Sequence, residues 1–334
     1  MSEMLVSVYC LAYNHAKYIT KTLEGFVSQK TDFAFEVIVH DDASSDDTAS
    51  IIRRYEEQYP EIIKGVYQTE NQYSKRVGIV NTFLVDKMSG EYVAVCEGDD
   101  YWSDPYKLQK QVDALKSNPQ CAMCVHRTEE IYEDGQPTGK LYPQGLEGSG
   151  VIESRDFLKM CSSYSFHTSS YMFKAEEWKK YRKDPPEFKK ACRVGDETYM
   201  LYFGQLAPVY YINETMSAYR RGVPSSWSMK QAQNTDIEKI LKHPRDMVET
   251  LRLFDEFTGY KYHDIVVHRS AGMKMKIATL TKNAKDMLRK ENREYFNVLP
   301  RSKKITVIVA LFFPGLIIRR YKSRLKKLYQ KKGY

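Results

Sequence analysis

Residues 92–100 are Tyr92-Val93-Ala94-Val95-Cys96-Glu97-Gly98-Asp99-Asp100, an apolar run that ends in three acids around one glycine. Its first part contains the β-branched and aromatic residues that favour a buried strand. In open sheets whose strands are joined by helices, ligands bind at the carboxyl ends of the strands. This stretch therefore predicts a central strand and marks the edge of the sheet at which a ligand binds.

The residues before it alternate between strand and helix patterns. Apolar residues follow one another in the strand-like segments and recur on one helical face in the segments between them. The expected strands are 4–10, 35–40, 62–68 and 92–96, and the expected helices are 15–29, 46–59 and 80–88. Strands separated by helices of this length are typical of a parallel sheet with helices on both faces.

The acidic turn after the last of these strands predicts a metal site. Glu97 and Asp99 are two residues apart, so their carboxylates can point to one side and bind a hard divalent cation, with positions left for a diphosphate. The simpler interpretation is a turn before a capped helix, and Ser103-Asp104-Pro105 has the residue types of a helix start. That explains Asp104 but not the acids that directly follow the strand, so we favour metal binding.

The second expected strand also ends in acids, within Asp41-Asp42-Ala43-Ser44-Ser45-Asp46. A carboxylate at this point can accept hydrogen bonds from a uracil ring or a ribose hydroxyl. Capping of the next helix by Ser45 or Asp46 explains the later residues equally well. This motif alone does not decide between the two.

Three segments in this order resemble family 2 glycosyltransferases: 7–14, 37–44 and 90–100. The resemblance extends over residues 4–220. It implies an inverting enzyme with the nucleotide-diphospho-sugar (GT-A) fold, an α/β architecture with a Rossmann-like mixed sheet, helices on both faces and a C-terminal helical extension.

The resemblance also assigns roles at the two acidic motifs. It implies that Asp42 lies near the nucleoside and that Asp99 stands where the family's Asp-x-Asp motif binds Mg²⁺ or Mn²⁺. Glu97 occupies the first position of that motif, and a glutamate there can still reach a metal or a ribose. Asp100 is expected to assist the two metal ligands.

A third acidic motif, within Val194-Gly195-Asp196-Glu197-Thr198, stands where family members carry an acidic pair, most often Glu-Asp. The family's catalytic base maps onto Asp196, with Glu197 as the less favoured substitute. The dipole at a helix N-terminus favours the ionised carboxylate, which an inverting transfer needs in order to take the proton of the acceptor hydroxyl. The alternative interpretation is an ordinary acid at a helix start.

Further residues are expected around these motifs. Arg220 or Arg221 is expected to neutralise the departing diphosphate through bidentate hydrogen bonds, although a solvated loop explains them equally well. On the acceptor side we expect His167, Trp102 and Trp227; a lone histidine, however, is more often structural than catalytic. The expected nucleotide-sugar-binding residues are Tyr13, Asn14, Asp42, Arg76, Glu97, Asp99, Asp100, Arg220 and Arg221.

The net charge of +8 is concentrated at the C-terminal end. Residues 301–334 contain eleven Lys or Arg and no acid, which leaves −3 for the rest of the chain. Enzymes that act on nucleic acids usually carry positive charge around the active site, and the aromatic residues are not interleaved with these cations as in a base-stacking surface. We therefore expect no nucleic-acid partner.

Within this basic tail, an apolar run at 305–318 is broken by Pro314-Gly315 and followed by cations at 319–327. A helix that crosses a bilayer needs about 20 apolar residues, so the run is too short to span one. An apolar patch beside clustered cations instead suits binding to an anionic membrane surface. A buried helix with a solvated basic end, or a surface for a partner protein, is the alternative.

The six cysteines include one Cys-x-x-Cys pair, Cys121 and Cys124, in an apolar run that is typical of a buried strand. Without a second pair, or a histidine at zinc-finger spacing, we interpret both as structural. The residues after Met1 lead into a strand pattern that lacks the features of a signal peptide. We expect a cytoplasmic enzyme, peripheral on the inner face of the membrane.

The sequence thus predicts a catalytic domain at 1–228, a helical extension at 229–300 and a membrane-associating tail at 301–334. The expected reaction transfers a hexosyl or N-acetylhexosaminyl group from a nucleotide-diphosphate donor to a hydroxyl of a glycan, free or lipid-linked, in cell-surface polysaccharide biosynthesis. UDP is expected from its frequency in the family. Two alternatives stay open: a sugar-1-phosphate nucleotidyltransferase, whose Gly-rich basic loop is missing at 13–16, and a non-catalytic membrane scaffold that retains the fold.

Overall fold

The computed structural model describes residues 4–161, 165–192, 195–224, 226, 229 and 234–330, with side chains up to residue 323. The chain divides into two compact units: Met1–Pro185 with Tyr199–Ser225, and Pro186–Thr198 with Ser226–Tyr334. The expected catalytic domain, 1–228, ends close to the boundary between Ser225 and Ser226. The short segment that carries Asp196 belongs to the second unit, together with the expected extension and tail.

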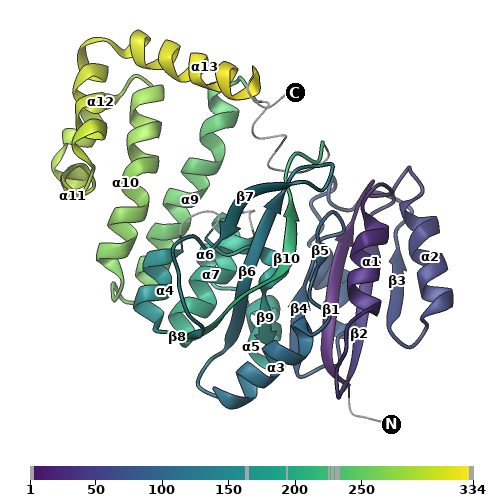
Figure 1. Cartoon of the computed structure of the whole chain (residues 1–334). Coiled ribbons are helices and arrows are strands. Elements are labelled where there is room, and N and C mark those ends of the chain that lie inside the picture. Colours follow the sequence, from purple (N-terminus) through teal and green to yellow (C-terminus); the bar gives the residue numbers. More distant parts are fainter. Residues whose placement is uncertain are drawn as a thin grey trace. The chain divides into compact units, whose positions relative to one another are not determined.

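One mixed sheet organises the first unit, with the strand order β3-β2-β1-β4-β9-β6-β10-β5 (Figure 1). β1 pairs in parallel with β2 and β4, and β2 pairs in parallel with β3, which confirms the parallel sheet expected for the first hundred residues. β9 is antiparallel to both β4 and β6. The strands are β1 Met4–Ala12, β2 Ala34–Asp41, β3 Ile63–Tyr67, β4 Tyr92–Val95, β5 Tyr101–Trp102, β6 Met123–Ile131, β7 Pro137–Tyr142, β8 Gly150–Ile152, β9 Met172–Lys174 and β10 Val209–Arg220.

The helices near the sheet are α1 Ile19–Val27, α2 Thr48–Gln58, α3 Lys107–Ser117, α4 Ser154–Met160 and α5 Ala175–Lys183. The helix expected at 80–88 is instead a π-helical turn at Val80–Leu84 followed by a 3-10 turn at Val85–Lys87. Val80, Thr82 and Val85 are β-branched, and such residues lower helix propensity.

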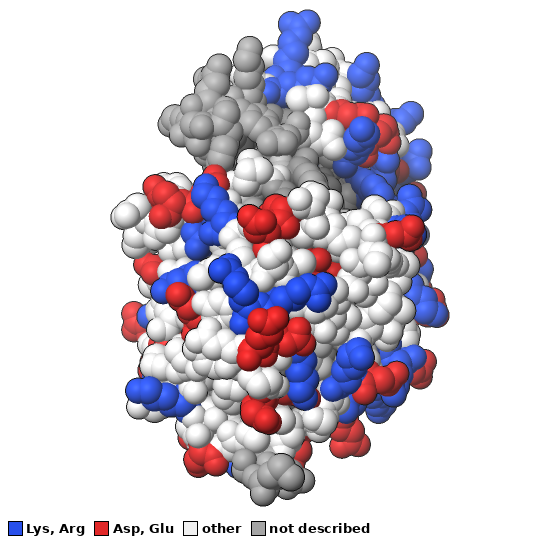
Figure 2. All heavy atoms as spheres, turned by 90° about the vertical axis from the view of Figure 1, so that its right-hand side faces the viewer, with Lys and Arg blue, Asp and Glu red and all other residues white. Residues whose placement is uncertain are grey.

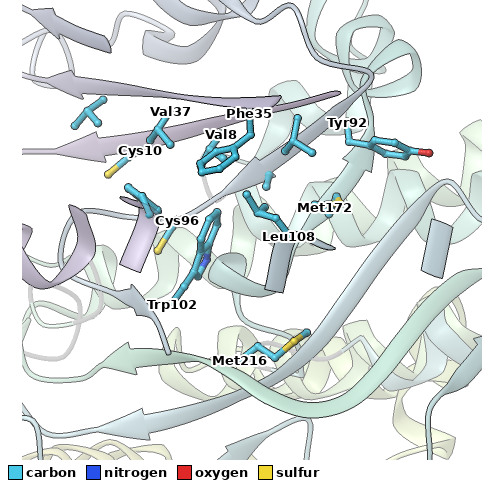
Figure 3. Close-up of a cluster of buried hydrophobic side chains, with 14 of the residues drawn as sticks. Val8, Cys10, Phe35, Val37, Tyr92, Cys96, Trp102, Leu108, Met172 and Met216 are labelled. Carbon is cyan, nitrogen blue, oxygen red and sulfur yellow. The ribbon is translucent and has the colours of Figure 1, made fainter. Parts of the chain in front are cut away.

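A continuous core lies between one face of the sheet and helices α1, α2 and α3. Successive strand residues point to opposite faces, so Val8, Cys10 and Val37 contribute to this core, where Trp102 and Leu108 meet them (Figure 3). On the opposite face, Tyr9 contacts Trp178 of α5 with ring centroids 5.6 Å apart, and Phe173 contacts Phe203 of α7 (Gly195–Leu206) at 4.4 Å. Helices therefore cover both faces, as the sequence predicts.

The second unit is helical. Its helices are α6 Glu187–Ala191, the start of α7, α9 Ile237–Phe257, α10 His263–Leu280, α11 Arg293–Asn297, α12 Arg301–Phe312 and α13 Pro314–Gln330. Small residues of α10, Ala271 and Ala278, form a core with Val307 and Ala310 of α12. Part of the expected tail is therefore integral to the packing of this unit.

The apolar run of the tail is divided at Pro314, where α12 has ended and α13 begins (Figure 1). Among the described residues, no helix has the length and apolar character needed to span a bilayer. Over most of the face drawn in Figure 2, Lys and Arg side chains are interspersed with Asp and Glu.

All six cysteines are buried thiols, and Cys124 lies on β6. The strand expected around the Cys-x-x-Cys pair is therefore present, although it begins at Met123, after Cys121. Burial raises the pKa of both thiols, to about 12 for Cys124. A buried thiol with a raised pKa is a poor nucleophile and a poor metal ligand, in agreement with a structural role.

Candidate active site

Three carboxylates converge at the carboxyl end of β4. One oxygen from each of Glu97, Asp99 and Asp100 lies within 4.8 Å of the others, the only such group of potential ligands found among the described residues. Asp99 and Asp100 are buried, whereas Glu97 is exposed. A side chain at Gly98 would come within 2.8 Å of Nδ1 of His15, so the turn needs a glycine at this position.

The electrostatics of this turn are unfavourable without a compensating charge. Burial, followed by the negative charges of Asp99 and Glu97, holds the pKa of Asp100 well above its ordinary value. Three carboxylates at this spacing supply the hard oxygen ligands that Mg²⁺ and Mn²⁺ prefer, and a divalent cation would relieve their mutual repulsion. The residues present therefore fit a divalent cation.

Arg220, at the end of β10, contacts the same turn. Its backbone N–H donates to Oδ1 of Asp100 at 2.8 Å, and its Nε donates to the carbonyl of Asp99 at 3.1 Å. Its Nη1 donates to the carbonyl of Glu133 at 2.8 Å, and the guanidinium lies over the ring of Tyr18, 5.0 Å from the centroid. These contacts bring one positive charge to the acids in a fixed orientation.

Arg221 is engaged elsewhere. Its Nη1 lies 3.2 Å from Oε1 of Glu130, whose side chain is almost fully buried. Of the two arginines expected beside the diphosphate, Arg220 is the one that contacts the acidic turn.

The loops after β1 and β2 are joined by hydrogen bonds. The N–H of Asn14 donates to Oγ of Ser44 at 2.9 Å, and Oδ1 of Asn14 accepts from the N–H of Ser45 at 2.8 Å. Asn14 has a φ of 55°, a left-handed conformation that asparagine tolerates better than most residues. This turn brings Nε2 of His15 to 3.9 Å from Oδ2 of Asp99.

His15 was not expected in the site, because the helix predicted from residue 15 begins only at Ile19. The pattern of apolar residues located the helix but not the turn that precedes it. A histidine in the polar turn between the first strand and the first helix was the available signal.

Asp42 is buried and organises the loop after β3. Its Oδ1 accepts from the N–H of Gln72 at 2.8 Å, and its Oδ2 accepts from the N–H of Tyr73 at 3.0 Å. Asp46, the expected helix cap, accepts from the N–H of Thr48 at 3.0 Å. The two acids of this motif thus differ in their surroundings. Asp46 caps the start of the next helix, whereas Asp42 is a buried carboxylate at the edge of the sheet.

Two other residues of the expected nucleotide site lie on exposed turns. Tyr13 is 37% exposed, and Arg76 is exposed with a φ of 63°. Among the described residues, no hydrogen bond joins the Arg76 side chain to the acidic turn.

His167 lies beside Asp100. Its Nε2 is 3.7 Å from Oδ2 of Asp100, its Nδ1 accepts from the N–H of Ser169, and its ring stacks on Tyr219 with centroids 4.2 Å apart. Burial lowers the pKa of His167 to about 3, so the imidazole is neutral at pH 7. Tyr219 is a contact that the sequence did not predict.

The expected acceptor-side role of Trp102 does not agree with its position in the structure. It is only 3% exposed, its ring packs edge-on against Phe26 at 4.9 Å, and its indole N–H donates to the carbonyl of Ser169 at 3.0 Å. Trp102 lies on β5, which pairs with β10, and its side chain faces the core. It therefore has almost no surface that could contact an acceptor. Trp227, the other tryptophan expected on the acceptor side, lies outside the described residues.

Asp196 and Glu197 begin helix α7, and their part of the chain belongs to the second unit. Burial, followed by the charge of Glu197, raises the pKa of Asp196 to about 6, so burial outweighs the expected effect of the helix dipole. Oε2 of Glu197 lies 3.1 Å from Nη2 of Arg269, and both side chains are nearly buried. Of the two acids, Glu197 is thus the one that forms an ion pair.

Comparisons with known proteins agree with this geometry. A model of glycosyl transferase family 2 matches residues 7–177. An uncharacterised protein of Mycobacterium tuberculosis (strain ATCC 25618 / H37Rv) is 40% identical over 273 residues, which cover 78% of this chain and 71% of the relative. TuaG of Bacillus subtilis (strain 168), a putative teichuronic acid biosynthesis glycosyltransferase, is 32% identical over 152 residues, 45% of this chain and 58% of the relative.

A solved structure shares the fold. The crystal structure of S. aureus TarS 1-349 in complex with UDP matches with a TM-score of 0.59 at 14% sequence identity, covering 99% of this chain and 93% of that chain. This likeness shows the fold, the GT-A architecture that the sequence predicts, with the C-terminal helical region included in the match.

Proposed function

The chain belongs to glycosyltransferase family 2, and we propose that it transfers a sugar from a nucleoside-diphosphate donor to a glycan hydroxyl with inversion at the anomeric carbon. The observation that carries this proposal is the group of three carboxylates, Glu97, Asp99 and Asp100, within 4.8 Å of one another at the carboxyl end of a central strand. Ligands bind at that edge in sheets of this kind.

In this proposal Asp99 and Glu97 hold Mg²⁺ or Mn²⁺, and Asp100 assists. When bound, the cation neutralises the negative charge of the departing diphosphate. Arg220 supports the same region, because it reaches the backbone of Asp99 through Nε and Asp100 through its N–H. Arg221 is the less favoured diphosphate ligand, since its guanidinium pairs with Glu130.

The donor's nucleoside is proposed to bind at the ends of β1 and β2. Asp42 is buried there with both oxygens already accepting one backbone hydrogen bond each, and a carboxylate oxygen can accept a second. Tyr13, Asn14 and Arg76 are the neighbouring candidates. UDP is the first nucleotide to test, because TarS, which shares the fold, was crystallised with UDP.

Asp196 is proposed as the base that takes the proton of the acceptor hydroxyl. A pKa of about 6 suits this role, since the carboxylate is ionised at neutral pH and still basic enough to accept a proton. Glu197 is less suited, because Arg269 already neutralises its charge. On the acceptor side we retain His167, which is neutral and adjacent to Asp100.

A hexose or an N-acetylhexosamine is the proposed sugar, and a cell-surface polysaccharide or its lipid-linked precursor is the proposed acceptor. The relative TuaG, a putative glycosyltransferase of teichuronic acid biosynthesis, supports this class of acceptor.

The decisive experiment measures UDP release from a panel of UDP-sugars with and without Mn²⁺. Metal-dependent release from at least one donor, lost in Asp99→Asn and in Asp196→Asn, supports the enzyme. A folded protein that neither binds nor turns over any nucleotide sugar would instead favour the alternative of a non-catalytic scaffold.

We further propose that the second unit binds an anionic membrane surface through α12 and α13. Five large apolar side chains between 305 and 316 face solvent: Ile305, Ile308, Phe312, Phe313 and Leu316, which are 43–72% exposed. Arg319, Arg320 and Lys322 follow them and are exposed. Apolar area beside clustered cations suits a surface that offers both acyl chains and negative headgroups.

The proposed organisation is therefore a catalytic domain at 1–228, a helical extension at 229–300 and a docking tail at 301–334. The proposed location is the cytoplasmic face of the membrane, where a lipid-linked acceptor would be within reach.

A further inference from the structure

Glu197 and Arg269 form an ion pair that is largely withdrawn from water. Glu197 is in the first turn of α7, and Arg269 is in the middle of α10. Oε2 of Glu197 and Nη2 of Arg269 are 3.1 Å apart, and the two side chains are only 6% and 10% exposed. Exposed ion pairs contribute little to stability, whereas the loss of one partner from a buried pair is strongly unfavourable. This pair therefore fixes the start of α7 to α10.

The pair also determines the surroundings of Asp196, the preceding residue. Oδ1 of Asp196 accepts a hydrogen bond from the N–H of Glu197 at 2.9 Å, so the carboxylate is oriented by the same turn. The charge of Glu197 is the second cause, after burial, of the raised pKa of Asp196. The backbone of Glu197 thus orients the Asp196 carboxylate, and the side-chain charge of Glu197 contributes to its raised pKa.

Other charged groups near the pair come from α9 and α10. Burial lowers the pKa of His243 of α9, and the negative charge of Glu197 partly opposes that effect. The charge of Asp246 of α9 also raises the pKa of His243, and the charge of Lys276 of α10 lowers it. Arg269 is the group of this set that makes a direct ion pair with Glu197.

We propose that Arg269 is a positioning residue for sugar transfer: by holding Glu197, it fixes the turn from which Asp196 takes the acceptor's proton. This inference rests on the proposed role of Asp196 as the base. It assigns the helical extension a part in the reaction, although Arg269 itself touches neither donor nor acceptor.

The test compares Arg269→Met, Arg269→Lys and Glu197→Gln with a control in the same unit. Arg252→Met is the control, because Arg252 pairs with Glu249 and Glu256 on the exposed side of α9. For each variant we would measure kcat for UDP release at saturating donor, the donor Kd by calorimetry, the pH profile of kcat and the circular dichroism spectrum.

A misplaced base slows the chemical step without changing donor binding. Arg269→Met should lower kcat by about tenfold to a hundredfold and leave the donor Kd within about twofold of wild type. Arg269→Lys keeps the charge but not the forked geometry, so its kcat should be intermediate. Glu197→Gln should move the acidic limb of the profile to lower pH, since the negative charge beside Asp196 is gone. The control should match wild type.

A folded Arg269→Met with wild-type kcat would overturn the inference, as would a loss of kcat matched by an equal loss of donor affinity. If Arg269→Met does not fold, Arg269→Lys is used in its place, and a wild-type kcat in that variant would also overturn the inference. Asp196→Asn is measured in parallel. If it transfers normally, the base assignment and this inference fail together; if it is inactive while Arg269→Met is unimpaired, only the inference fails.

Discussion

The backbone N–H of Arg220 donates a 2.8 Å hydrogen bond to Oδ1 of Asp100, which lies 120 residues earlier in the chain. Through this bond, and through Nε of Arg220 to the carbonyl of Asp99, the end of β10 holds the turn that follows β4. The Asp100 carboxylate and the backbone of Asp99 are thus held by a partner distant in sequence, whose positive charge lies beside the turn.

Replacement of Arg220 should therefore disturb the conformation of the acidic turn, even when the positive charge is kept. Arg220→Lys cannot make both side-chain bonds at once, to the carbonyls of Asp99 and Glu133. We expect UDP affinity in the presence of Mn²⁺ to fall about tenfold to a hundredfold, because one hydrogen bond to a charged group contributes about 1.5–3 kcal/mol. Calorimetry measures this, with Arg221→Lys as the matched control; equal losses in the two variants would contradict the assignment.

Asp99→Asn should abolish the metal dependence of nucleotide binding. The change removes one negative ligand from the three that lie within 4.8 Å of one another. UDP release should be lost, and UDP affinity should become the same with EDTA as with Mn²⁺. If the wild-type protein itself binds UDP equally well under both conditions, the metal proposal is wrong.

Asp42→Ala should weaken the binding of UDP and of UDP-sugars to the same extent. The substitution removes a proposed nucleoside ligand and frees the N–H groups of Gln72 and Tyr73 from their acceptors. Asp47→Ala is the control, because Asp47 is exposed in the same motif and makes no capping hydrogen bond with its side chain. Unchanged UDP affinity in Asp42→Ala would remove this residue from the site.

The membrane proposal calls for point substitutions and not for removal of the tail. Deletion of residues 301–334 would take Val307 and Ala310 out of the core of the second unit. Phe312→Glu with Phe313→Glu changes two side chains that are 72% and 64% exposed. We expect the double variant to keep its melting temperature and to lose flotation with anionic vesicles.

Two comparisons make the vesicle experiment specific. High salt should release the wild-type protein, since exposed charges are screened within about 10 Å at 0.1 M ionic strength, and neutral vesicles should bind it less well. Flotation of the double variant at the wild-type level would exclude this face as the docking surface.

Local patterns in the sequence were sufficient for the first part of the fold. Strands β1–β4 correspond to the apolar runs at 4–10, 35–40, 62–68 and 92–96. Helical segments separate these runs along the chain, and this alternation predicts the parallel pairing of the strands. The acidic turn was located for the same reason: it directly follows one of these strands. Boundaries shifted by a few residues where turns, such as the one at His15, carry no periodic signal.

What the sequence could not predict depends on distant partners. Nothing near Trp102 indicates that its ring packs on Phe26 in the core, and nothing near Glu197 indicates Arg269, 72 residues later. The choice between Arg220 and Arg221 likewise depends on where β10 ends beside the acidic turn. Such relationships follow from tertiary packing, which residue spacing does not encode.

The last prediction concerns the pH dependence of the proposed base. A carboxylate accepts a proton only when ionised, so kcat should fall as pH drops through the pKa of Asp196, about 6. The fall should be about tenfold per pH unit below that value. Because burial raises this pKa above its ordinary value of 3.8, the stability of the fold should decrease as pH rises from about 4 to about 6 and stay lower above that.

Asp196→Asn tests both consequences at once. The amide keeps the size of the side chain but cannot take a proton, so kcat should fall on the order of 10²–10⁴-fold with donor affinity within about twofold of wild type. Because the neutral side chain no longer buries a charge, the melting temperature at pH 8 should equal or exceed that of wild type. A variant that loses activity together with stability would indicate a structural role for Asp196. A variant that stays active while Glu197→Gln is dead would move the base to Glu197.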